Sequence, residues 1–327
     1  MTMKGLGKIA IGCMVLLAGC QQAEEVEIES EELPLSIEAS IGDLQMSRYV
    51  SSDNPQTPNN LSFSAGDKIG LFVNDRSVVK WTYQGNDSWS AETPVYWPNK
   101  LENCYFYAYY PYVEATSKES IRMPSLAGQN GTIESLYLYD FLVASTGRKY
   151  SDANGVVSFT GNASFKHVSS LVAVTVDGNC DLKASKIKKI SFAATNIASV
   201  TTYSFRTKET TIVDDEKNNK MESCNLDFQM TGEDKTFYFI LNKGVNLSDV
   251  TFCIEYSTGE NHYKAEKADL GSEALASGGR YNFNLKISDG VLTISGGTIQ
   301  NWGDGTQMDD IEINNPTVDN NQGDENA

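Results

Sequence analysis

The chain has 327 residues and a formal net charge of −17 at pH 7, from 26 Lys and Arg against 43 Asp and Glu. This acidic balance, without a basic patch, argues against nucleic acid as a partner. The content of 16 Tyr and 26 Gly suits an all-β extracellular protein better than a helical one.

The N-terminus has the three parts of a secretory signal. Lys4 and Lys8 form its positive region, and the apolar stretch 9–18 is too short to span a bilayer as a helix. Small residues precede the cleavage that we predict between Gly19 and Cys20, and lipoprotein processing requires a cysteine at the first mature position. We therefore predict a signal peptide over 1–19 and a diacylglycerol on Cys20. The alternative is a plain secreted protein in which Cys20 is incidental.

Residues 20–32 are dominated by glutamate. A run this acidic is expected to be solvated and disordered, as a tether between membrane and folded region. Acidic residues just after the lipid-bearing cysteine also resemble the surface-export signal of lipoproteins in some Gram-negative anaerobes. Tether and export tag are both kept as interpretations.

The first folded region is predicted over 33–155. Apolar and polar residues alternate over 33–41, which is typical of a half-buried strand. After a Ser/Asn/Pro-rich loop at 51–60, aromatic-rich strand candidates follow; they lie at 61–73, 81–89, 94–98 and 104–112. We expect both faces of the last to be covered, with a sugar-stacking platform as the alternative. An apolar run at 137–144 and a polar loop at 145–155 end this region.

The second folded region is predicted over 156–313. Alternation at 171–176 opens a new set of strands, with further candidates at 187–193, 224–230, 236–241, 250–256, 281–287 and 291–294. A turn with positive backbone angles is expected at Gly278 and Gly279. No long amphipathic helix interrupts the strands, so β-sandwiches are the expected fold. The tail 314–327 is rich in Asn, Asp and Gly and is expected to be disordered.

No catalytic or metal-binding constellation emerges. His167 and His262 are the only histidines and lie far apart, and the acidic segment 303–310 lacks the ligand spacing of a calcium loop. We predict no cofactor, no metal and no enzymatic activity. Four cysteines follow Cys20 and their spacing fixes no disulfide pairing; most are expected to be buried thiols. They are Cys104, Cys180, Cys224 and Cys253.

Several segments, in this order, resemble the fimbrillin family (Mfa-like, FimA-type) of Gram-negative anaerobes. They are Phe63 to Phe72 (FSAGDKIGLF), Tyr96 to Pro98 (YWP), Phe106 to Pro111 (FYAYYP), Phe165 to His167 (FKH), Gly278 to Tyr281 (GGRY) and Ile299 to Trp302 (IQNW). Each motif is weak alone, but together they span about 250 residues. The resemblance implies two tandem transthyretin-like β-sandwich domains and a role as a subunit of type V pili.

The resemblance also implies an assembly route. The lipoprotein precursor reaches the cell surface, an arginine-specific protease removes the first strand with its lipid anchor, and a neighbouring subunit fills the groove with a strand. Strand 33–41 is the expected segment for removal, and Arg48 matches the cleavage position. An ordinary surface role for Arg48 is the alternative. The donor strand is expected from 291–294 or 298–302.

The predicted function is therefore a structural fimbrial subunit at the outer membrane and cell surface, with other subunits as partners in a head-to-tail polymer. The alternative is a tip adhesin or stand-alone surface lipoprotein that binds host glycans, host proteins or other cells. Exposed aromatics such as Trp81, Trp89 and Trp97 in one groove would favour that alternative.

Overall fold

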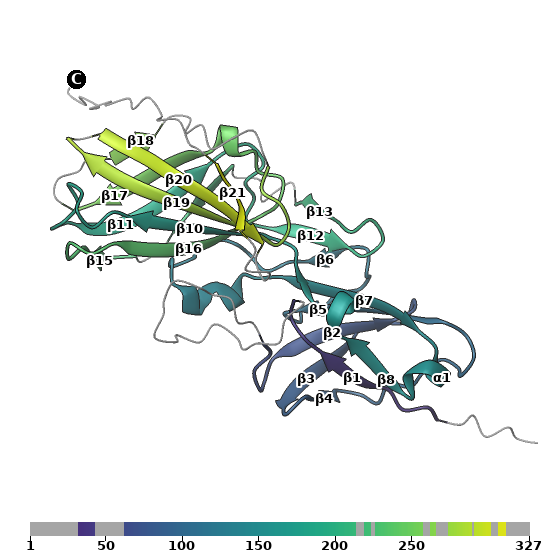
Figure 1. Cartoon of the computed structure of the whole chain (residues 1–327). Coiled ribbons are helices and arrows are strands. Elements are labelled where there is room, and N and C mark those ends of the chain that lie inside the picture. The colour runs from purple at the N-terminus through teal and green to yellow at the C-terminus, as the bar shows by residue number, and fades with distance from the viewer. Residues whose placement is uncertain are drawn as a thin grey trace, which may run out of the picture. The chain divides into compact units, whose positions relative to one another are not determined.

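A computed structural model describes residues 32–42, 62–213, 219–223, 226–257, 262–265, 274–289, 291–301 and 307–311. From Leu33 onward the chain forms one compact unit. It is built from strands with a few short helices, so the predicted all-β class is confirmed (Figure 1). No helix among the described residues is long and apolar enough to cross a membrane.

The first half of the chain forms a six-stranded antiparallel sheet. Its order is β4 (Ser88–Ala91), β3 (Val79–Gly85), β2 (Lys68–Val73), β5 (Cys104–Tyr110), β7 (Leu142–Arg148) and β9 (Lys166–His167). A separate parallel pair joins β1 (Ser36–Ala39) to β8 (Val156–Phe159). One apolar core contains side chains from both groups, including Ile37, Leu71 and Phe159.

The second half contains two sheets around the largest core. One has the order β16 (Lys235–Leu241), β10 (Ser170–Val176), β19 (Gly279–Ser288), β20 (Val291–Asn301) and β21 (Gln307–Ile311). The other has the order β14 (Lys220–Glu222), β11 (Lys186–Ala193), β17 (Thr251–Tyr256) and β18 (His262–Ala265), with β15 (Phe228–Gln229) also paired to β11. Phe192, Phe239, Phe252 and Phe283 from the two sheets meet in this core.

A small sheet joins the two halves. Strand β12 (Thr201–Ser204) pairs with β13 (Glu209–Ile212) on one side and with β6 (Ile121–Arg122) on the other. Beneath it, Tyr109 and Phe141 from the first half pack with Tyr203 from the second. The halves therefore share hydrogen bonds and an apolar cluster.

Two local expectations need correction. The predicted loop at 145–155 is instead the end of β7 and the short helix α1 (Tyr150–Ala153), because residues 145–148 pair with 104–107 on β5. Strand β5 is also not covered throughout, since Tyr105 is 53% exposed. The turn expected at Gly278 is present, with φ of 69°.

The division into 33–155 and 156–313 stays a prediction. Strands β8 and β9 follow residue 155 but pair with β1 and β7 of the first half. Phe165 also belongs to the first core. These contacts favour a boundary after His167.

Candidate assembly site

The first strand, over 33–41, packs on the apolar core of the first half, and we call the part of this core that it covers the seat of the strand. Alternation in the sequence directs every second side chain inward: Leu33, Leu35, Ile37 and Ile41 are each 4–7% exposed, whereas Ser36 and Glu38 face solvent. Full burial of an aliphatic side chain contributes about 1.5–3 kcal/mol. The four side chains together thus hold the strand with roughly 6–12 kcal/mol of apolar burial.

Backbone hydrogen bonds hold β1 mainly along one edge. It runs parallel to β8, with Ser36 opposite Val156 and Ala39 opposite Phe159. Beyond the strand, the Ser40 amide donates to Phe159 O at 3.0 Å. Among the described residues, no strand pairs with the other edge of β1 between Ser36 and Ala39.

In the part of the chain that the structure describes, the second edge is paired at the beginning of the segment. The Leu35 amide donates to Val95 O, and the Trp97 amide donates to Leu33 O, each at 2.9 Å. The Trp97 indole Nε1 also donates to Gly155 O at 3.0 Å. Trp97 thus ties the start of the first strand to the turn that precedes β8.

The predicted donor segments, 291–294 and 298–302, can be compared with the structure of the C-terminal strands. Leu292 and Ile294 of β20 are fully buried in the second core. Removal of 291–294 from its own subunit would expose them. Strand β21, by contrast, lies at the end of its sheet. The donor segment stays a prediction: Thr298 and Gln300 are themselves paired with both β19 and β21, so the placement favours neither part.

Most predicted processing residues cannot be placed. Gly19, Cys20, Arg48, Cys224 and the tail 314–327 lie outside the described residues. The remaining cysteines Cys104, Cys180 and Cys253 are free thiols. Burial raises the pKa of the Cys104 and Cys253 thiols, which disfavours their reactive thiolate forms.

His167 forms a buried pair that the sequence does not reveal. Its Nδ1 lies 2.9 Å from Asp140 Oδ2, and both side chains are 4% exposed. The partner lies 27 residues earlier in the chain, so only the β7–β9 pairing brings the two together. His167 is thus a satisfied core histidine; the His262 side chain lies outside the described atoms.

The aromatic residues expected for a carbohydrate groove are mostly internal. Trp81 and Trp97 are each 3% exposed, and Trp89 is partly buried against Phe63, with ring centroids 5.0 Å apart. A stacking platform needs exposed ring faces. These three tryptophans therefore do not form one.

Comparison with known proteins identifies the family. The model of the family described as Fimbrillin-like matches residues 52–302, which is most of the chain. The chain belongs to the fimbrillin-like family. No curated protein sequence matches this fimbrillin-like chain.

Solved structures agree with the fold. A candidate cell adhesion protein of Bacteroides uniformis is 14% identical, with a TM-score of 0.58 and coverage of 84% of this chain and 99% of that one. A second, from Bacteroides ovatus, is 16% identical with a TM-score of 0.57 and the same coverage. At these identities the likeness establishes the fold of the fimbrillin-like chain and nothing more.

Proposed function

We propose that this fimbrillin-like protein is a structural subunit of a cell-surface fimbria. The observation that carries the proposal is the family match over 52–302 together with a first strand whose apolar face fills the core. The two tandem transthyretin-like domains expected from the family are part of this proposal, as are adhesion and association with other fimbrial subunits.

The proposal includes export as a lipoprotein. Cleavage between Gly19 and Cys20 and a diacylglycerol on Cys20 would hold the precursor at the outer membrane, with 20–32 as tether. Replacement of Cys20 by Ser should abolish acyl labelling and leave the protein unanchored. A precursor that carries no lipid while Cys20 is intact would reject the anchor and favour a plain secreted protein.

Assembly is proposed to follow removal of the first strand by an arginine-specific protease. Loss of β1 would uncover the apolar seat and the unpaired edge of β8, two features that an incoming strand satisfies together. Since no described strand pairs with the second edge of β1 along Ser36–Ala39, release of β1 breaks few of the backbone hydrogen bonds that the structure describes. Head-to-tail donation does not close on itself, so it generates a filament.

The proposal can be tested on the precursor that begins at Cys20. Low doses of an arginine-specific protease should cut after Arg48 and yield filaments or ladders in a sizing assay. Arg48→Lys should block both effects with that enzyme, yet remain a substrate for trypsin. Arg76→Ala is the matched control, because Arg76 lies in the exposed turn between β2 and β3.

The result of the protease experiment distinguishes a polymerising subunit from the alternative functions. Cutting after Arg48 without assembly would favour a capping tip subunit, the alternative adhesin function. No cutting at Arg48, with a stable monomer, would favour a stand-alone surface lipoprotein and overturn strand exchange. Host glycans or host proteins are then the partners to examine.

A further inference from the structure

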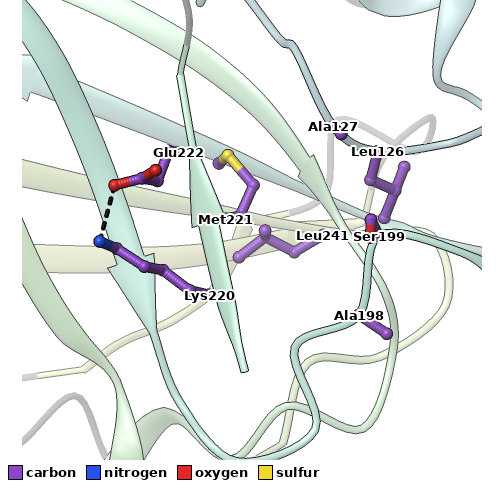
Figure 2. Close-up of a pocket in the computed structure, with 8 residues that line it drawn as sticks. All are labelled: Leu126, Ala127, Ala198, Ser199, Lys220, Met221, Glu222 and Leu241. Carbon is purple, nitrogen blue, oxygen red and sulfur yellow. Dashed lines mark ion pairs between the residues drawn. The ribbon is translucent and has the colours of Figure 1, made fainter. Parts of the chain in front are cut away.

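A cavity of about 340 Å³ opens beside β14 in the second half of the chain (Figure 2). Its apolar lining comes from segments far apart in sequence, and includes Leu126, Ala198, Met221 and Leu241. Ala127, Ser199, Lys220 and Glu222 also line the cavity. Lys220 and Glu222 form an ion pair at 2.6 Å, drawn as a dashed line. Met221 and Leu241 also belong to the second core. The cavity therefore gives solvent access to one side of the second core.

The strand next to the cavity has an open backbone edge. β14 is the end strand of its sheet, and no strand among the described residues pairs with its other side. The Ser223 amide donates to Ile190 O and the Ala194 amide donates to Asn219 O, so the odd-numbered residues bond toward β11. Antiparallel ladders alternate. The backbone groups of Lys220 and Glu222 therefore point away from β11, toward the open edge.

The side chains that line the cavity indicate which kind of molecule can bind in it. Among the described residues that line the cavity none is aromatic, so this lining offers no stacking surface for a sugar. Its aliphatic lining suits an aliphatic side chain of a peptide, and its volume leaves ample room for one. The charges near the rim balance: Lys220 pairs with Glu222 at 2.6 Å, and Lys189 lies 3.6 Å from Glu222 and 3.4 Å from Glu255. A flanking sequence without strong net charge fits such a rim.

We propose that β14 is a docking strand for an extended segment of a partner polypeptide, and that one aliphatic side chain of this segment enters the cavity. The outward N–H and C=O groups of Lys220 and Glu222 bond the backbone of the segment, while the cavity selects its side chain. This is strand addition at a sheet edge, with backbone bonds for affinity and a pocket for specificity. It shares no residue with the β1 seat and does not depend on strand exchange there.

The test uses the chain that begins at Cys20 and a threonine peptide with blocked ends and one central leucine. Threonine favours an extended backbone and adds no charge. Binding should slow hydrogen exchange at the amides of Lys220 and Glu222. The same peptide with a central alanine should bind at least roughly tenfold more weakly, because three buried carbons are lost.

Two variants separate the backbone edge from the cavity. Glu222→Pro removes the outward N–H, and Glu222→Ala is its matched control because it keeps that N–H. Ala198→Leu fills the cavity and leaves the edge in place. Glu222→Pro and Ala198→Leu should each weaken peptide binding about tenfold or more, and Glu222→Ala should bind as the parent does. Near-ultraviolet circular dichroism checks that each variant is folded.

Several results would overturn the proposal. They are no peptide binding at millimolar concentration, binding without protection of the two amides, or equal affinity of folded Glu222→Pro and Glu222→Ala. Displacement of the peptide by a methyl glucoside that occupies the cavity would assign it to sugars instead. Unchanged peptide binding by folded Ala198→Leu would show that no side chain of the peptide enters the cavity.

Discussion

Truncation of Ile37 tests whether the first strand is held by its apolar face. Ile37 is 4% exposed in the first core, so Ile37→Ala removes three buried carbons. At about 0.8 kcal/mol per carbon the transfer loss is roughly 2.4 kcal/mol, and the cavity left behind raises the expected cost to about 3 kcal/mol. Glu38→Ala, on the exposed face of the same strand, should stay within about 0.5 kcal/mol.

Urea unfolding followed by tryptophan fluorescence measures both variants. Trp97 is a suitable reporter because its amide donates to Leu33 O and its indole to Gly155 O, one on each side of the site. Amide exchange at Ser40, which donates to Phe159 O, should also accelerate in Ile37→Ala. Equal unfolding midpoints for Ile37→Ala and Glu38→Ala would refute the seat as described.

Three further predictions concern buried polar groups. Asp140→Ala should cost about 1–3 kcal/mol, because it removes the carboxylate that His167 Nδ1 contacts in the core, and Asp140→Ala with His167→Leu should cost less than the single variant in the same urea assay. Gln129→Ala should cost about 1–3 kcal/mol, since its side chain bonds both the N–H and the C=O of Ile240 at the edge of β16. Gln129→Glu should cost at least as much, because it would bury a carboxylate against the carbonyls of Leu126 and Ile240. Burial raises the pKa of Tyr203 to about 12, so its neutral form is favoured by folding. That stability is fully present below the unfolded pKa of about 10 and is lost as pH rises through 12, so the melting temperature should fall there and fall less in Tyr203→Phe. A thermal midpoint that stays flat from pH 9 to 12, an unchanged Gln129→Ala, or a double variant worse than Asp140→Ala would each contradict its prediction.

The sequence predicted much of the local structure. Alternation over 33–41 identified the first strand and the side chains that it buries, because strand periodicity is a property of the local backbone. Similar reasoning located the strand around Val172 and the turn at Gly278. The order of the weak motifs from Phe63 to Trp302 led to the family that the comparison then established.

Other features depend on long-range pairing. The loop expected at 145–155 became strand and helix because β5, about 40 residues earlier, supplies hydrogen bonds to residues 145–148. Likewise, two of the three tryptophans that could have lined a surface groove are buried, and no property of Trp81 or Trp97 alone distinguishes a core position from a stacking platform.

By itself, the sequence determined the all-β class, the apolar face of the first strand and the motifs that place the chain in its family. Only the tertiary structure decided that this strand lies parallel to β8, that His167 meets Asp140, and that a cavity opens beside β14. The physical reason is range. Periodicity and turn chemistry act between neighbours, whereas strand partners, buried pairs and cavities arise between segments that the chain separates by tens of residues.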